Sequence, residues 1–256
     1  MQTELQIDTV SVMADLKATR TVDGGSTKKR TAEQHEGRSS LSHGGKRARL
    51  SERAAGMTDW DADRQAKYIW DAFVATASGW LTDMELQGRE FGDCVVKVAG
   101  KRSELATFVN GCMMDASLLR RKEPPKISRP YVLVIAPSGI RAAELARQLH
   151  SFGPQCIVAK LFAKHLKIED QIKFLQEKRV RIAVGTPDRI QKLIENGALS
   201  LQNVELVVLD TTVDAKQRTI YEIPEVLESW TRLLDAHIGS RLAAKKTRIG
   251  VFGADK

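Results

Sequence analysis

The stretch GTPDRIQKLIENGALSLQNVELVVLDTTV, residues 185–213, carries the strongest fold signal in this 256-residue chain. It begins with a Thr-Pro pair, which is typical of a helix start with proline at the first helical position. A short amphipathic segment follows and is ended by Gly197. The stretch closes on the apolar run VELVVLD, whose last residue is the acid Asp210. A helix followed by a continuous apolar strand predicts one unit of a parallel sheet that is covered on both faces.

The same alternation extends over the second half of the chain. Apolar, β-branched runs occupy residues 131–136, 156–162, 180–185, 204–210 and 247–253. Amphipathic segments separate them at 140–152, 165–179, 188–196 and 224–238. Because parallel strands need a crossover that is usually helical, this order predicts a three-layer α/β domain with a parallel sheet. Ligands of such sheets bind beyond the carboxyl ends of the strands, so we expect a site at that edge.

The chain changes character near residue 57. Residues 1–56 contain no Trp, Tyr or Phe and are rich in Gly, Ser, Thr and charge, which predicts a disordered tail. We expect a globular domain at 57–256, with a mainly helical part at 57–130 and the core sheet at 131–256. Thr58 and Asp61 are predicted to cap its first helix. Two basic clusters in the tail are candidate nuclear-localisation signals, with a solvated tail as the alternative: Lys28, Lys29, Arg30, Lys46, Arg47 and Arg49.

Composition narrows the class of partner. Forty Lys and Arg against thirty-two Asp and Glu give a net charge of +8, which favours polyanionic partners such as RNA. The three cysteines form no C-x-x-C pair, so neither a metal site nor a disulfide framework is expected. No stretch approaches the run of roughly eighteen apolar residues that a membrane span needs, and we expect no membrane partner.

Two helix starts follow predicted strands and would lie at the same edge of the sheet. Ser138 and Thr186 are both placed as N-caps. Free backbone N–H groups at neighbouring helix amino termini favour phosphate binding. The alternative is that both segments are ordinary βα turns.

These segments resemble motifs of the DEAD-box RNA helicases. Residues 136–146, APSGIRAAELA, resemble the APTRELA motif with an insertion, and residues 185–190 resemble the TPGR motif. Gly253-Ala254-Asp255 falls where the S-A-T element would follow a strand. The resemblance covers residues 131–256 and implies a RecA-like (P-loop NTPase-like) domain. It also implies a set of RNA-facing residues: Ser138, Gly139, Arg141, Thr186, Pro187 and Arg189. Asp188 replaces the motif's glycine and puts a carboxylate where a phosphate would approach.

The nucleotide motifs depart from that family. A phosphate-binding loop needs G-x-x-x-x-G-K-[ST], whereas Gly100-Lys101 is followed by Arg102 and has Val95 in place of the first glycine. After Asp210 come Thr211 and Thr212, so the acid that would orient an attacking water is missing. Gly100, Lys101 and Asp210 therefore form a degenerate nucleotide site in this interpretation. We expect no hydrolysis of ATP and no cofactor, while residual ATP binding stays open.

Asp210 has a second, weaker catalytic interpretation. A strand that ends in D-x-D-x-[TV] is the signature of haloacid-dehalogenase-like phosphotransferases. Thr212 stands where the second acid would be, and no downstream basic residue stands out as a partner. We therefore do not expect this chemistry.

A single RecA-like domain with decayed nucleotide motifs and a basic tail resembles the CMS family of small-ribosomal-subunit biogenesis factors. The resemblance implies a nucleolar, nuclear, non-catalytic component of the small-subunit processome that binds pre-ribosomal RNA and processome proteins. A late basic run is a further candidate RNA contact, or else a solvated helix end: Arg241, Lys245, Lys246 and Arg248. Two alternatives stay open, an ATP-dependent RNA helicase of the DEAD-box type and a protein-only adaptor without RNA contact.

Overall fold

The computed structural model describes residues 53–87, 92–96, 104–123, 125–164 and 166–253. The chain divides into two units, Met1–Gly45 and Lys46–Lys256, and every described residue belongs to the second. Both basic clusters of the tail, between Lys28 and Arg49, lie outside the described residues, as do Gly100 and Lys101. Within the described ranges, no helix has the length and apolar character needed to cross a bilayer.

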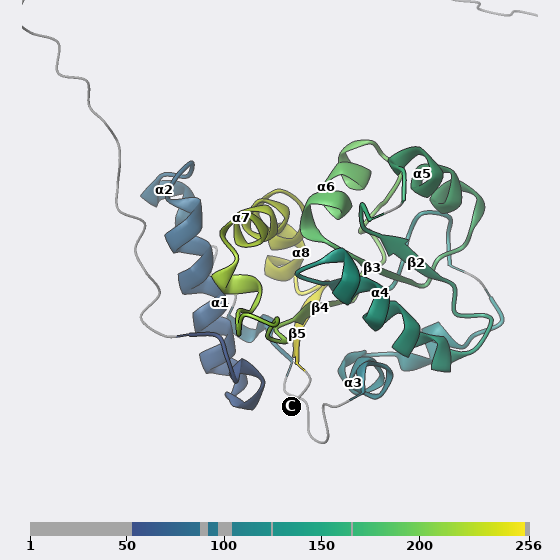
Figure 1. Ribbon diagram of the computed structural model, residues 1–256, viewed down its shortest axis with the longest axis horizontal. Coiled ribbons are helices and arrows are strands. Elements are labelled where there is room, and N and C mark those ends of the chain that lie inside the picture. Colours follow the sequence, from purple (N-terminus) through teal and green to yellow (C-terminus); the bar gives the residue numbers. More distant parts are fainter. Residues whose placement is uncertain (1–52, 88–91, 97–103, 124, 165, 254–256) are drawn as a thin grey trace, which may run out of the picture. The chain divides into compact units, whose positions relative to one another are not determined.

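A five-stranded parallel sheet forms the centre of the second unit (Figure 1). Its strands are β1 (Val132–Ile135), β2 (Val158–Leu161), β3 (Ile182–Gly185), β4 (Leu206–Asp210) and β5 (Arg248–Phe252). They lie in the order β2-β3-β1-β4-β5, and every neighbouring pair is parallel. Each strand falls inside one of the apolar runs of the sequence, so the predicted parallel sheet is confirmed.

Helices cover both faces of the sheet, because successive residues of a strand point to opposite sides. On β1, Val132 and Val134 pack into a core with α3 (Leu105–Cys112) and α4 (Gly139–Gln148). Leu133 and Ile135 belong to the opposite core, which buries residues of α1 (Ala62–Ala77), α6 (Pro187–Glu195) and α7 (Pro224–Leu233). Figure 1 shows α4 and α6 on different sides of the sheet. This arrangement confirms the three-layer α/β architecture.

The remaining helical segments are α5 (Ile168–Glu177), which is as long as α4, and several shorter pieces. The shorter pieces comprise α2 (Asp83–Leu86), α8 (Gly239–Ala243), a π-helical turn at Leu234–Ile238 and 3-10 turns at Met57–Asp59, Gly92–Cys94, Ala116–Leu119, Leu149–Phe152 and Ile220–Glu222. Only one of the two residues expected to cap α1 does so. Asp61 accepts a hydrogen bond from the backbone N–H of Arg64 at 2.8 Å, whereas Thr58 is buried in the preceding 3-10 turn.

The edge strand β2 is closed by a side chain from α5. The amide of Gln171 donates to the carbonyls of Lys160 at 2.8 Å and Phe162 at 3.1 Å. Gln171 is buried, and its own side-chain oxygen accepts from Arg189 of α6 at 3.0 Å. An edge strand with unpaired backbone groups invites pairing with another chain. Here two of the outward carbonyls already have a donor, which blocks that route of association.

Candidate functional site

The carboxyl ends of the central strands bring three separate parts of the sequence together. Ile135, the last residue of β1, is in register with Gly185 of β3 and Leu209 of β4. Ser138, Thr186 and Asp210 therefore lie at one edge of the sheet, where the sequence predicted the site. This edge is the part of the fold at which parallel α/β domains bind ligands.

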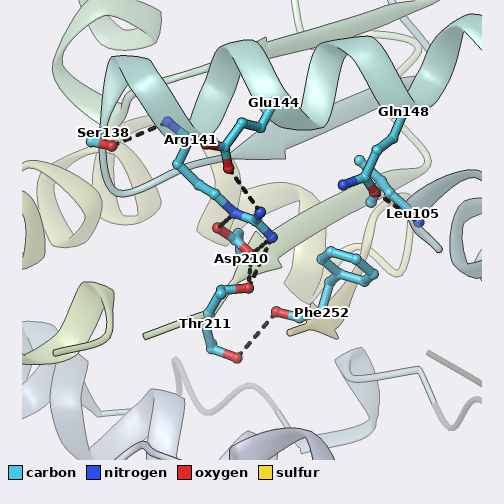
Figure 2. A network of polar contacts seen from close by, with 9 residues as sticks. Leu105, Ser138, Arg141, Glu144, Gln148, Asp210, Thr211 and Phe252 are labelled. Atoms are coloured by element: carbon cyan, nitrogen blue, oxygen red, sulfur yellow. Dashed lines mark hydrogen bonds and ion pairs between the residues drawn. The ribbon is translucent and has the colours of Figure 1, made fainter. Parts of the chain in front are cut away.

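Asp210 is fully buried and is held by an arginine of α4 (Figure 2). Arg141 donates through Nε to Oδ2 of Asp210 at 2.9 Å and through Nη2 to Oδ1 at 3.2 Å. The same Nη2 reaches Oγ1 of Thr212 at 2.9 Å, and that hydroxyl donates to Oδ1 of Asp210 at 2.7 Å. Glu144, one turn along α4, accepts from Nη1 of Arg141 at 3.2 Å. Both carboxylate oxygens of Asp210 thus have donors within the protein.

The electrostatics of this cluster explain why the arginine is needed. Burial raises the pKa of Asp210 above its ordinary value, while the hydrogen bonds from Arg141 and Thr212 oppose that rise. An arginine stays charged at any pH that a folded protein tolerates, so the guanidinium supplies the counter-charge. A divalent cation at Asp210 would have to displace that guanidinium. The negative charge of Asp210 is therefore neutralised by Arg141, a group within the fold.

Asp210 was the one acid in the degenerate motif that could have bound a nucleotide-associated metal ion. In the structure its carboxylate is already hydrogen-bonded to Arg141. Glu144 and Thr212 complete the cluster, and no sequence motif predicted that either of them would bind Arg141. The signal for Glu144 is its spacing of three residues from Arg141, which places both on one face of α4. No comparable signal links Arg141 to Asp210, because their contact depends on how α4 packs on the sheet.

The amino terminus of α4 has the geometry expected from the sequence. The hydroxyl of Ser138 accepts from the backbone N–H of Arg141 at 3.2 Å, which confirms the predicted cap. Ser138 is exposed and Gly139 is half-buried. The Arg141 side chain, however, leads into the fold, with 16% of its surface exposed. Its expected outward-facing position is wrong in this structure, because Asp210 holds it.

The corresponding start of α6 is more closed than the sequence implied. Thr186 occupies the N-cap position without a side-chain capping bond, and Pro187 is buried. Nη1 of Arg189 donates to the carbonyl of Leu166 at 3.3 Å as well as to Gln171. Asp188 forms an exposed ion pair with Lys192 at 2.9 Å. The expectation that Pro187 and Arg189 face outward is therefore also wrong, because packing buries Pro187 and internal hydrogen bonds hold Arg189.

The late basic run lies at the opposite edge of the sheet. Arg248 is the first residue of β5, so it and the preceding lysines are at the amino ends of the strands. Arg248 donates to the carbonyl of Cys112 at 2.7 Å, and Lys245 lies 3.6 Å from Asp93. Arg241 donates to Oγ1 of Thr247 and to the carbonyl of Val204. The run, Lys246 included, cannot form one surface with Ser138 and Thr186, which follow the carboxyl ends.

Fold and site together define a class of protein. This is a three-layer α/β domain with a five-stranded parallel sheet, and the acid at the carboxyl edge of that sheet is paired with an arginine. The family model described as "CMS1: U3-containing 90S pre-ribosomal complex subunit" matches residues 18–252. The chain belongs to this family, and the resemblance predicted from its sequence is confirmed.

Individual relatives agree with that assignment. Protein CMS1 of Chaetomium thermophilum is 44% identical over 113 residues, 43% of this chain and 45% of that protein. Protein CMSS1 of Homo sapiens is 32% identical over 160 residues, 62% of this chain and 57% of that protein. The chain thus matches about half the length of these relatives.

A crystal structure of a DEAD box protein from Methanococcus jannaschii has a TM-score of 0.44 and 21% identity, over 73% of this chain and 48% of that one.

Proposed function

We propose that this protein is a non-catalytic factor of ribosome biogenesis that acts in the 90S pre-ribosome, the small-subunit processome. In this proposal its RecA-like domain serves as a scaffold that binds pre-ribosomal RNA and processome proteins. The description of its family, a subunit of a U3-containing 90S pre-ribosomal complex, supports that setting. It also supports a place in the nucleolus and nucleus, where such particles assemble.

The main support for a non-catalytic role is that the carboxylate of Asp210 is buried and already paired with Arg141. Asp210 has no exposed surface, and Arg141 bridges both of its oxygens. Phosphoryl transfer depends on a metal ion held at the phosphates and on a group that orients the attacking water. A carboxylate that already has an internal counter-charge is a poor metal ligand. Thr211 and Thr212 supply no acid in place of the missing one.

One further sequence feature favours the same conclusion. The chain has no match to G-x-x-x-x-G-K-[ST], the loop whose backbone N–H groups cradle phosphates. Gly100-Lys101 is the nearest remnant within the globular part. Residual binding of ATP without hydrolysis is compatible with the proposal, because weak contacts to a nucleotide need no intact metal site.

The RNA part of the proposal rests on charge and on position. The net charge of +8 favours a polyanion, and the exposed start of α4 offers backbone N–H groups at the edge where this fold binds ligands. Ser138, Gly139 and Thr186 remain candidate contacts there. Lys245, Lys246 and Arg248 would require a second contact at the amino edge.

Affinity purification of the tagged full-length chain, with sequencing of bound RNA and identification of bound proteins, tests the setting. We expect U3 RNA and precursors of the small-subunit RNA to co-purify with processome proteins, above the level of the tag alone. Recovery of proteins without those RNAs after nuclease-free preparation would contradict RNA binding and favour a protein-only adaptor. Crosslinking the same sample with ultraviolet light then maps the RNA-bound peptides.

A further inference from the structure

A cationic groove runs between α4 and the edge strand β2. The cavity has a volume of about 320 Å³ and is lined by Arg147 of α4, Lys160 of β2 and Lys164 of the following loop. Ala143 and Phe162 form its apolar part, and Ile140 lies at its rim with 58% of its surface exposed. We call this feature the cationic groove. It begins beside Gly139 at the start of α4 and extends two turns along that helix.

The three cations of the groove are exposed. Within the described part of the chain, none of Arg147, Lys160 and Lys164 forms an ion pair. Glu144, the acid of α4 that lies closest in sequence, is paired with Arg141 at 3.2 Å. Three positive charges around one concave surface attract an anion with several charges more strongly than scattered lysines do.

We propose that the cationic groove binds the phosphodiester backbone of single-stranded RNA, an inference that rests on the proposed RNA-binding function. The arginines that the motif resemblance assigned to RNA, Arg141 and Arg189, are held by Asp210 and Gln171. The groove supplies cations that are free to move onto phosphates. The first turn of α4 adds backbone N–H groups at one end, beside Gly139.

The shape of the groove determines the kind of recognition. Phe162 is only 6% exposed, so it offers no open face on which a base could stack. Binding without base stacking depends on phosphate charge and not on base sequence. We therefore expect RNA of different base composition to bind with similar affinity. An acidic peptide is the competing occupant. It cannot add to β2 as a further strand at the carbonyls of Lys160 and Phe162, because Gln171 holds them.

The test compares two full-length triple variants with equal charge. One removes the groove cations, Arg147→Gln, Lys160→Gln and Lys164→Gln. The control removes three exposed lysines from other surfaces, Lys122→Gln, Lys178→Gln and Lys216→Gln. The probe is fluorescein-labelled oligouridylate of about 20 nucleotides, long enough to span more than one binding site of this kind. Its affinity is measured over a series of salt concentrations, and oligoadenylate is measured in parallel.

We expect the groove variant to bind about tenfold more weakly or worse at physiological salt, with the control close to the unmodified protein. Loss of three phosphate contacts also makes the slope of log affinity against log salt shallower by about 2. Unmodified protein that binds RNA while the groove variant matches the control overturns the groove and leaves RNA binding intact. Failure of the unmodified protein to bind overturns both. Loss of co-purifying acidic proteins with unchanged RNA affinity identifies the peptide as the occupant.

Discussion

The guanidinium of Arg141 and the carboxylate of Asp210 form two hydrogen bonds, of 2.9 and 3.2 Å, between positions 69 residues apart. One group belongs to the helix after β1 and the other ends β4. The pair therefore joins the α4 layer to the centre of the sheet. It also occupies both oxygens of the Asp210 carboxylate, the group that a metal ion would need to find open.

Removing the arginine alone should destabilise the domain strongly. Arg141→Ala leaves the fully buried Asp210 without a counter-charge, and such changes lower the free energy of unfolding by about 3 to 5 kcal/mol. Chemical denaturation measures the difference. Arg147→Ala is the matched control on the same helix, where loss of an exposed side chain should change stability by about 0.5 kcal/mol or less.

Replacing both partners should recover much of that loss. Arg141→Met with Asp210→Leu removes the buried charge together with its partner, and such exchanges are often neutral or stabilising. We expect the double variant to be more stable than Arg141→Ala by about 2 kcal/mol or more. A double variant no better than the single one would mean that the ion pair is not what holds α4 to the sheet.

A second buried arginine should be equally sensitive. Arg181 is 2% exposed, and its guanidinium donates to the carbonyls of Leu118, Gln155, Arg121 and Glu123. Arg181→Leu leaves these acceptors without a donor and should lower the free energy of unfolding by about 4 kcal/mol. Arg181→Lys should restore little, because one ammonium group cannot reproduce the planar fork. Full rescue by lysine, read from thermal unfolding, would show that charge alone matters.

Gly185 should not tolerate a methyl group. A Cβ at this position would lie 2.0 Å from the carbonyl oxygen of Leu161, its partner on β2. Because that oxygen is backbone, β2 must move, and we expect Gly185→Ala to lower the free energy of unfolding by about 3 kcal/mol. Gly79→Ala is the control, since its Cβ would meet Thr76 at an ordinary 3.5 Å. Equal denaturation midpoints for the two variants would contradict this packing.

Cys156 should make stability depend on alkaline pH. Burial raises the pKa of its thiol from 9.0 to about 11, so the folded state holds the proton more tightly than the unfolded state. Its contribution is fully present below pH 9.0 and is lost as the pH rises through about 11. We expect stability to fall by about 2 to 3 kcal/mol more than in Cys156→Ala over this range. Parallel curves for the two proteins would show that the thiol is not desolvated.

The sequence predicted the layers because its signals there are local. All five strands lie within continuous apolar runs, and the caps at Ser138 and Asp61 depend on residues three positions away. The direction of the Arg141 side chain depends on a partner 69 residues distant, which no local pattern contains. Arg181 likewise stands inside an apolar run, so no local sequence pattern predicted that it is buried and donates to four carbonyls.

The sequence alone indicates on which edge of the sheet the late basic run lies. Arg248 stands at the start of the apolar run of β5, whereas Ser138 and Thr186 follow the ends of theirs. In a parallel sheet these positions lie at opposite edges. The groove cations were harder to find, because Arg147 and Lys160 meet only when α4 packs beside the edge strand.

The rate of ATP hydrolysis, measured with and without single-stranded RNA, tests the central claim most directly. We predict that the purified full-length chain hydrolyses ATP no faster than its Lys101→Ala variant, and that added RNA does not raise the rate. That result fits a domain whose carboxyl-edge acid is neutralised by Arg141. A rate that rises with RNA and falls on Lys101→Ala would contradict this claim and identify an RNA-dependent ATPase, as expected of a DEAD-box helicase.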